Sequence, residues 1–346
     1  MAYTTIDKSS LFFSPTLYVG NGGTKTVTGI PFEPDMTWLK NRSVAGDNEI
    51  YDKLRGVGYR IYTNNNSAQD DLGSQGLSAW TSDGFTVGNN TAINGNGNNL
   101  VSWNWKMNGT GASNTEGSIN TTATSANTTS GCSIITYTGT GANATIGHGL
   151  GMVPTFIIFR RYAQAENWNV YHKSAGADKS LRLNEKGASA SDSTALNSTA
   201  PTSSLISLGS SVNTNANGNP MIAWCFSDVQ GFSKAGSYTG NGNADGPFVY
   251  TGFKPAFVMF KRTSSTDNWV IIDNRRLGYN DLNYGFFPNT NSAEQTSTDF
   301  RFDLLSNGFK LRNNSGYTNG SGQTYIYMAF AEAPFVGSNN VPATAK

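Results

Sequence analysis

Apolar residues in this chain fall in short runs that are rich in aromatic and β-branched side chains and are separated by stretches of Gly, Asn, Ser and Thr. In the run at 154–161, Phe156 and Ile158 fall on one face of a strand, because side chains alternate along a strand. Ile157 and Phe159 fall on the other face, and a strand that is apolar on both faces belongs between two layers. No window of roughly 11 to 18 residues has the spacing of an amphipathic helix. The pattern therefore predicts an all-β protein.

The same order of features occurs three times along the chain. Each time, a Tyr-x-Gly-x-Gly motif is followed by a proline, by a strand-like run that ends on a basic residue, and by a closing apolar run. The motifs start at Tyr18, Tyr137 and Tyr238, the prolines are Pro34, Pro154 and Pro255, and the closing runs are 100–105, 221–226 and 327–332. The period of about 100 residues is longer than the roughly 20 to 50 residues of solenoid and propeller units. We therefore predict three tandem β-sandwich repeats, each large enough to bury its own core.

Composition places the boundaries between these repeats. Residues 108–130 contain no large apolar side chain except Ile119 and predict a Ser/Thr/Asn/Gly linker. The repeats then span 18–107, 131–229 and 236–335. Residues 1–17 are either an attachment segment or a terminal strand, and 336–346 form a polar C-terminal tail. Little linker separates the second and third repeats, so we expect a close contact between those two but not between the first and second.

An acidic residue follows the basic end of each proline-led run by six or seven positions. The pairs are Lys40 with Asp47, Arg160 with Glu166, and Lys261 with Asp267. A hairpin of that loop length places the two side chains opposite each other, where an ion pair stabilises by about 0.2 to 1 kcal/mol. We predict three structural ion pairs at these positions and favour that interpretation over a ligand site.

The charge of the chain argues against several kinds of partner. Charged residues make up 14% of the sequence, against about 25% in an average soluble domain. The formal net charge is +1 and no long block of Lys or Arg occurs, so we expect no nucleic-acid partner. We also expect no membrane insertion, since no apolar run approaches about 18 residues, and no classical export signal. Cys132 and Cys225 are far apart in the sequence and predict neither a metal site nor a disulfide framework.

Catalytic chemistry finds little support among the titratable residues. The only histidines are His148, in a Gly-rich turn, and His172, at a strand position that Asp52 and Asp273 occupy in the other repeats. A polar structural role is favoured for both, because a nucleophile with its base or two placed carboxylates are needed for hydrolysis. We predict no catalytic residues, no metal and no cofactor, although polysaccharide cleavage stays open as an alternative.

Carbohydrate binding usually needs an exposed aromatic side chain beside amide and hydroxyl groups. Most aromatic residues of the chain fall on strand positions and are expected in the core. Four lie in polar loop contexts and are the weak candidates for a binding site: Trp80, Tyr279, Tyr284 and Tyr317.

Several motifs of the chain resemble a known group of proteins. These are the opening YVGNGGTKTVTGIPFEPDMTWLKNRS, the run LVSWNWK, the segment KPAFVMFKRTSSTDNWVIIDNRR and the closing YIYMAFAEAPF. Together they resemble an uncharacterised family of concanavalin-like or laminin-G-like β-sandwich domains found in virion structural, tail-fibre-like proteins of marine bacteriophages. The resemblance covers the chain outside residues 1–10 and the linkers, and the second repeat departs from it most.

The resemblance implies three tandem jelly-roll or concanavalin-like sandwiches in a non-enzymatic protein on the surface of a phage particle. A tail fibre or receptor-binding adhesin that contacts host surface glycans is the favoured interpretation. A capsid decoration protein and a polysaccharide-degrading tailspike enzyme are the alternatives. The expected partners are other virion proteins and a host glycan, and by analogy with phage fibres we expect a homotrimer.

Overall fold

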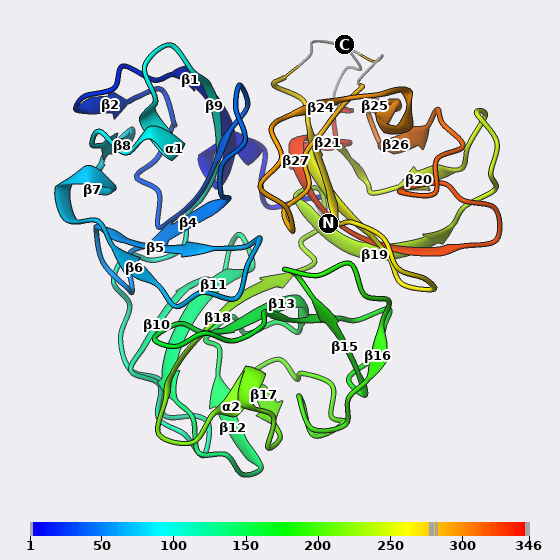
Figure 1. The fold of residues 1–346 in the computed structure, drawn as a ribbon. Coiled ribbons are helices and arrows are strands. Elements are labelled where there is room, and N and C mark those ends of the chain that lie inside the picture. The colour runs from blue at the N-terminus through cyan, green and yellow to red at the C-terminus, as the bar shows by residue number, and fades with distance from the viewer. Residues whose placement is uncertain (1–2, 277–279, 281–282, 343–346) are drawn as a thin grey trace.

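The structure is a computed structural model, and it describes residues 3–276, 280 and 283–342. Antiparallel strands dominate it, which confirms the predicted all-β class. The helices are single turns: α1 (Thr91–Asn94), α2 (Val212–Asn215) and the 3-10 turns η1 (Ser9–Leu11), η2 (Gly73–Gln75) and η3 (Thr298–Phe300). Figure 1 shows three lobes of strands arranged around a common centre. We call them unit 1 (13–105), unit 2 (123–227) and unit 3 (233–334).

Each unit combines a larger sheet with a small one. The larger sheet of unit 1 has the order β1 (Phe13–Val19), β9 (Asn99–Trp105), β3 (Met36–Asn41), β4 (Glu49–Asp52), β5 (Tyr59–Tyr62), β6 (Asp70–Asp71). Its small sheet is β2 (Lys25–Val27), β8 (Gly84–Val87), β7 (Leu77–Thr81).

Unit 2 repeats this plan with one extra strand at the start. Its larger sheet has the order β10 (Ala123–Asn127), β11 (Cys132–Thr138), β18 (Pro220–Ser227), β13 (Pro154–Arg161), β14 (Asn169–His172), β15 (Lys179–Arg182), β16 (Ala190–Ser191). Its small sheet is β12 (Ala144–Gly147) and β17 (Leu205–Leu208). The extra strand β10 comes from the segment 108–130 that composition predicts to be a linker.

In the described part of the chain, the larger sheet of unit 3 has four strands, fewer than the larger sheets of units 1 and 2. Its order is β19 (Ser233–Thr239), β27 (Thr324–Pro334), β21 (Phe253–Arg262), β22 (Val270–Asp273). Its small sheet is β20 (Phe248–Tyr250), β26 (Gly308–Leu311), β25 (Phe302–Leu305), and a two-stranded piece consists of β23 (Tyr284–Gly285) and β24 (Gln295–Thr296).

Strand registers make residues of the three units equivalent. The proline-led strand pairs with the closing strand so that Met36 faces Trp105, Phe156 faces Phe226, and Phe257 faces Phe330. The next strand places Asp52, His172 and Asp273 opposite those same three residues of the proline-led strands. The prediction that His172 shares its position with Asp52 and Asp273 is therefore confirmed.

The Tyr-x-Gly-x-Gly motif fixes the first strand of each unit to a later turn. The Tyr18 hydroxyl donates to the Ile93 carbonyl oxygen at 2.6 Å. Tyr137 and Tyr238 donate in the same way to Thr214 and Thr318. Glycine is required twice in the motif of unit 1, because a Cβ at Gly20 would lie 2.2 Å from a backbone oxygen and Gly22 has a φ of 69°.

A buried asparagine completes the same turn in each unit. The Asn94 side chain accepts from the Asn21 amide at 2.9 Å and donates to the Gly88 carbonyl oxygen at 2.8 Å. Asn215 and Asn319 make the corresponding bonds in units 2 and 3. All three are fully buried, so each amide satisfies backbone groups that the turn leaves without partners.

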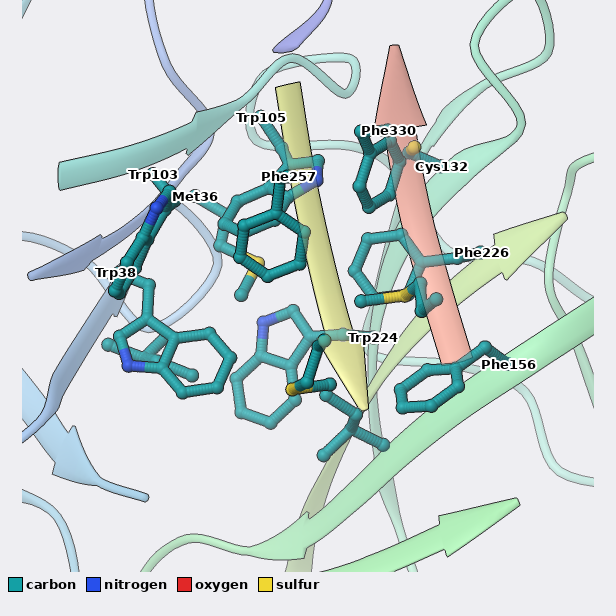
Figure 2. Packing of buried hydrophobic residues seen from close by; sticks show 14 of the residues in the cluster. Met36, Trp38, Trp103, Trp105, Cys132, Phe156, Trp224, Phe226, Phe257 and Phe330 are labelled. Atoms are coloured by element: carbon teal, nitrogen blue, oxygen red, sulfur yellow. The ribbon is translucent and has the colours of Figure 1, made fainter. Parts of the chain in front are cut away.

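The hydrophobic core has a shared centre and three outer parts. Each unit has its own cluster between its larger and small sheets, around Phe85 in unit 1, Ile157 in unit 2 and Phe309 in unit 3. A fourth cluster draws on all three larger sheets. At its middle the equivalent residues Trp105, Phe226 and Phe330 form a triangle with ring centroids 5.7 to 6.1 Å apart, and Figure 2 shows Phe257 beside them.

The three units therefore do not stand apart as the sequence suggests. Composition predicts a separation between the first and second repeats and a core inside each. The structure has a core inside each unit and in addition packs the inner faces of all three larger sheets against one another, because their proline-led and closing strands are largely buried on both faces.

Backbone hydrogen bonds join the units in a cyclic order. Unit 1 donates from Gln69 to the Tyr162 oxygen of unit 2, and Glu166 of unit 2 donates back to Asn66. The same two-bond contact recurs between units 2 and 3 and between units 3 and 1, through Ser189 with Thr263, Asp267 with Lys186, Glu294 with Arg42, and Gly46 with Asn291. Each contact is heterologous and the third returns to the first unit, so the chain forms a closed three-unit ring with pseudo-threefold symmetry.

The prediction that Lys40, Arg160 and Lys261 form ion pairs with the acids that follow them is wrong. All three cations are fully buried on the inner face and donate to backbone oxygens: Lys40 to Gly46, Arg160 to Asn66 and Ser67, and Lys261 to Lys186 and Asp267. The acids Glu166 and Asp267 pair with the next residues along, Arg161 at 4.0 Å and Arg262 at 3.2 Å. Alternation along the strand explains this, since neighbouring residues point to opposite faces.

Burial also lowers the pKa of these side chains. It lowers the pKa of Lys40 and of Lys261 to about 8, and that of Arg160 to about 10. In unit 1 no acid stands at the position of Glu166 and Asp267, because the backbone contacts make Gly46 their equivalent. Asp47 instead accepts from the Asn64 side chain at 2.6 Å.

The segments outside the predicted repeats are built into the ring. Within residues 1–17, strand β1 begins at Phe13, which is 1% exposed and stacks on Phe330 with centroids 4.9 Å apart. In the tail 336–346, Ser338 bonds to the Asp7 carboxylate. The two ends of the described chain therefore lie together.

Candidate functional site

The site that best fits ligand binding is a shallow depression on unit 1. It is lined by Glu33, Lys53, Gly56, Val57, Trp80, Gly109 and Thr110. Trp80 lies on β7 of the small sheet, opposite Phe85, and packs partly against the unit 1 core. Opposed residues of an antiparallel pair point to the same face, so the indole packs against the unit 1 core beside Phe85 and is only partly exposed to the depression.

Charged groups on one side of the depression are fixed by an ion-pair network. Lys53 Nζ lies 2.8 Å from Glu33 Oε1 and 2.9 Å from Asp35 Oδ1. Burial alone lowers the pKa of Lys53, but its hydrogen bonds to Glu33 and Asp35 outweigh this effect and raise it. Asp35 is buried and also accepts from the Met107 amide at 2.7 Å. Lys53 therefore stays positively charged, and Glu33, with a side chain 48% exposed, is the carboxylate that reaches solvent.

The other side of the depression is apolar and backbone-lined. Val57 is 45% exposed beside Trp80, and Gly56 and Gly109 have φ angles of 92° and 64°. The Trp80 indole nitrogen is buried without a hydrogen-bond partner in the described part of the chain. An apolar platform with a rim of one ammonium, one carboxylate and the Thr110 hydroxyl suits a sugar, whose face is apolar and whose edge carries hydroxyl groups.

The four aromatic candidates from the sequence are not brought together. Trp80 alone belongs to the unit 1 depression. Tyr317, in unit 3, packs between Phe287 and Phe300 with centroids 5.5 and 6.0 Å away, so its ring serves the core. Tyr284 is half-buried on β23, also in unit 3, and Tyr279 lies outside the described residues.

The depression has no direct counterpart in unit 3. Trp80 faces Phe85 across β7 and β8, and at the same register Leu304 faces Phe309 across β25 and β26. Leu304 is 6% exposed and belongs to the unit 3 core. Unit 3 therefore does not repeat this site.

Both histidines serve packing and hydrogen bonding. His148 Nε2 contacts the Thr202 oxygen at 3.2 Å, and burial lowers the pKa of His148. His172 accepts from the Ser174 amide on Nδ1 at 3.0 Å, and its Nε2 reaches the Tyr327 oxygen of unit 3 at 3.1 Å. Burial lowers the pKa of His172 to about 4, so it is neutral at neutral pH.

Two surveys of the described residues complete the search for sites. No group of three or more His, Cys, Asp or Glu side chains in residues 3–276, 280 and 283–342 is arranged to hold a metal ion. None of the helices in that part of the chain is long and apolar enough to cross a membrane.

Sequence reasoning missed several residues that the structure makes prominent. Lys53 and Glu33 carry no motif, and only the fold places them beside Trp80. In the part of the chain that the structure describes, Phe248 and Tyr250 are the exposed aromatics among the large hydrophobic residues, at 44% and 47%. The signal for them is the alternation in 248–250, where Val249 points inward; their aromatic character suggested a core position instead.

Comparison with known proteins gives a family but no activity. No curated protein matches the chain. A family model described as "Domain of unknown function (DUF7483)" matches residues 8–334, which spans the three-unit ring and the Trp80 depression. The chain is therefore a member of the DUF7483 family.

Proposed function

We propose that this protein is a non-enzymatic structural component of the surface of a bacteriophage particle and that it contacts host surface glycan through the Trp80 depression. The repeated motifs, which resemble those of tail-fibre-like virion proteins, support the virion assignment. We also assign each unit to the jelly-roll or concanavalin-like type, because its larger sheet faces a small sheet across an apolar cluster of its own. The observation that carries the binding role is the indole of Trp80 beside Lys53, Glu33 and Thr110.

The composition of the surface supports weak and mostly uncharged contacts. The chain carries 24 basic and 23 acidic residues, and the depression itself holds one accessible carboxylate and one paired ammonium. Single sites of this kind bind weakly, and several tethered copies gain avidity. Because unit 3 does not repeat the depression among the described residues, avidity is best supplied by several chains on one particle. A homotrimer or another oligomer, together with other virion proteins, meets this need.

The residues of the depression support binding without chemistry. Glu33 and Asp35 both hold the same Lys53 ammonium. A glycosidase needs one carboxyl group that protonates the leaving oxygen and another that attacks or activates water from the opposite side of the sugar. Of these two carboxylates only Glu33 lines the depression, and both are held by one ammonium, which does not match that arrangement.

Capsid decoration is a second candidate, and the closed three-unit ring favours it. The heterologous contacts that join sandwiches into a threefold assembly are already made inside one chain. A single copy with pseudo-threefold symmetry fits a threefold position of a capsid, where three similar contacts are available. Labelling the protein on intact particles separates the two candidates, since a fibre is confined to the tail and decoration covers the head.

Replacement of Trp80 by alanine tests the glycan contact. We expect saturable binding of the wild-type protein to host surface polysaccharide, and a rise in Kd of about tenfold or more for Trp80→Ala, since about 1.4 kcal/mol corresponds to a factor of ten. Tyr284→Phe, in unit 3, is the control and leaves Kd unchanged, and thermal unfolding verifies that both variants are folded. Absence of saturable binding by the wild-type protein contradicts the glycan role. Release of reducing ends from the polysaccharide contradicts the non-enzymatic assignment.

A further inference from the structure

The strand that carries the tyrosine of the Tyr-x-Gly-x-Gly motif and the strand that follows it form one side of the pair of sheets in each unit. In unit 3 these strands are β19, at the edge of the larger sheet, and β20, at the edge of the small sheet. In unit 2 they are β11 and β12, and in unit 1 they are β1 and β2. We call this side of a unit its open side. The three open sides differ in what covers them.

The chain itself covers the open side of unit 2. Strand β10 pairs antiparallel with β11, with Ala123 opposite Thr136 and Ser125 opposite Ile134. Upstream of β10, Ile119 bridges Ile146 of β12 and donates its amide to the Thr145 oxygen at 3.0 Å. The segment 108–130 thus satisfies the edges of both sheets. Figure 1 shows β10 lying along the outer side of β11.

The open side of unit 3 has no such cover. No strand of the described chain pairs with the outer edge of β19. The Gly240 amide donates to the Gln323 carbonyl oxygen, just before β27. By alternation, Ser237 and Thr239 therefore direct their backbone groups away from β27. Both residues are exposed. Nearer the start of the strand the Asp228 carboxylate already accepts from the Ala235 amide at 2.8 Å, which limits the free edge to Ser237 and Thr239.

Exposed aromatic side chains lie on the neighbouring strand of the same open side. Phe248 and Tyr250 on β20 are 44% and 47% exposed, while Val249 between them is buried. Lys234 of β19 donates to the Tyr250 carbonyl oxygen at 2.9 Å, which ties the two strands together. The Tyr250 hydroxyl contacts the Tyr3 hydroxyl at 3.2 Å, so the remaining aromatic surface faces outward. A free strand edge beside exposed aromatics is a common protein-binding surface.

Unit 1 differs from unit 3 at the corresponding edge. Pro15 of β1 stands at the register of Ile134 in β11 and of Ala235 in β19. Proline has no amide hydrogen, and it protects free edges against further pairing. Leu17 and Val19 are exposed there, but no aromatic pair accompanies them. Leu17 and Val19 stand at the registers of Ser237 and Thr239 and keep their amides. The edge that combines free amides with exposed aromatic neighbours is therefore that of unit 3.

We propose that the open side of unit 3 binds an extended segment of another protein chain, in the way that 108–130 covers unit 2. The chemistry of the covering segment indicates the partner: a strand of small Ser, Thr, Ala and Asn side chains that runs antiparallel to β19. Its backbone pairs with Ser237 and Thr239, and flanking residues cover Phe248 and Tyr250. Main-chain hydrogen bonds supply the affinity in this mode of recognition, and the pockets beside the strand supply the selectivity.

The test uses the full-length protein and a synthetic peptide with the sequence of residues 117–130, GSINTTATSANTTS, which includes the Ile119 flank that reaches the small sheet in unit 2. We expect saturable binding by fluorescence anisotropy, with slower hydrogen exchange of the amides at 237–239 when the peptide is present. Ser237→Pro removes one edge amide and raises Kd at least tenfold. Ser237→Ala is the matched control, because it keeps the amide, and it binds as the wild type does.

A second variant keeps the test decisive if Ser237→Pro does not fold. Phe248→Ser leaves the β19 edge intact, removes apolar surface from the open side, and raises Kd severalfold with no change in the thermal transition. The proposal is overturned by an absence of saturable binding, by equal binding of Ser237→Pro and Ser237→Ala, or by protection confined to 132–138, which signifies exchange with β10 in unit 2. None of these outcomes depends on glycan binding at Trp80.

Discussion

Replacing Phe330 with alanine lowers the free energy of unfolding of the whole protein by about 3 to 5 kcal/mol, the usual cost of a large cavity in a packed core. Phe330 is fully buried and contacts Phe13 and Trp105 of unit 1, Phe226 of unit 2 and Phe257 of its own unit. Neighbours from three units fix the walls of the cavity, so collapse around the smaller side chain is limited. Chemical denaturation followed by tryptophan fluorescence measures the change.

The control for this change is Phe248→Ala in the same unit. Phe248 is 44% exposed on β20, so its removal alters the free energy of unfolding by less than about 0.5 kcal/mol. The diagnostic result is that Phe330→Ala lowers the denaturation midpoint of signals from all three units together. A loss restricted to unit 3, with units 1 and 2 unfolding as in the wild type, contradicts the shared centre.

Acidification from pH 6.5 to about 4 costs the protein about 3 kcal/mol of stability through His172 alone. Burial lowers the pKa of His172 from 6.5 to about 4. Between those values the unfolded chain binds a proton that the folded protein does not, so stability falls as the pH falls through this window. Above pH 6.5 His172 is mainly neutral in both the folded and the unfolded chain, and the full stability is present. At about 1.4 kcal/mol for each pH unit, the shift corresponds to the stated loss.

His172→Gln isolates this effect because glutamine does not titrate. The variant keeps a side-chain donor near the Tyr327 oxygen, and its stability between pH 6.5 and 4 declines by about 3 kcal/mol less than that of the wild type. Lys173 and Asp228 act on the same histidine with opposite signs and remain unchanged in the comparison. Parallel pH profiles of the wild type and His172→Gln are the contradicting result.

The equivalent positions in the other units explain why a histidine is tolerated here. Asp52 and Asp273 form buried ion pairs with Arg55 at 2.7 Å and with Arg276 at 2.8 Å, three residues further along. Unit 2 has Ala175 where those arginines stand. Without a cation to neutralise a carboxylate, a neutral imidazole is the less costly buried group.

Much of the fold could be predicted from the sequence because strand patterns and turn motifs are local signals. Apolar alternation in runs such as 154–161 predicts the strands, and the Tyr-x-Gly-x-Gly motif marks the turns that Tyr18 and its equivalents close. The order of the motifs also predicted which residues share a register, as it did for His172. These signals depend only on residues that are neighbours in the sequence, so they predict strands and turns without knowledge of tertiary contacts.

The arrangement of the units could not be predicted in the same way. A cation at the end of an apolar run is commonly exposed, and the sequence predicts cross-strand ion pairs for Lys40, Arg160 and Lys261. Only the packing of the three larger sheets buries these side chains and binds them to backbone oxygens. The segment 108–130 has no large apolar side chain except Ile119 and is predicted to be a linker, yet backbone pairing of β10 with β11 requires no apolar side chains. Main-chain hydrogen bonds require no particular side chains, so the composition of a segment does not predict them.

The candidate site was predicted in part. Trp80 was singled out because it stands in a polar loop context, and it lines the depression on unit 1. Tyr317 was chosen for the same reason but packs against Phe287 and Phe300, since its loop folds back on the unit 3 core. Loop context alone does not distinguish a ring that faces solvent from one that faces the core.

The closed three-unit ring is tested most directly by differential scanning calorimetry of the intact protein. Because the central cluster draws on all three larger sheets, we predict one transition whose van't Hoff enthalpy equals its calorimetric enthalpy, the mark of a single cooperative unit. Three sandwiches that fold independently predict instead a van't Hoff enthalpy of about one third of the calorimetric value, or several resolved transitions. Either of these results would contradict the shared centre at Trp105, Phe226 and Phe330.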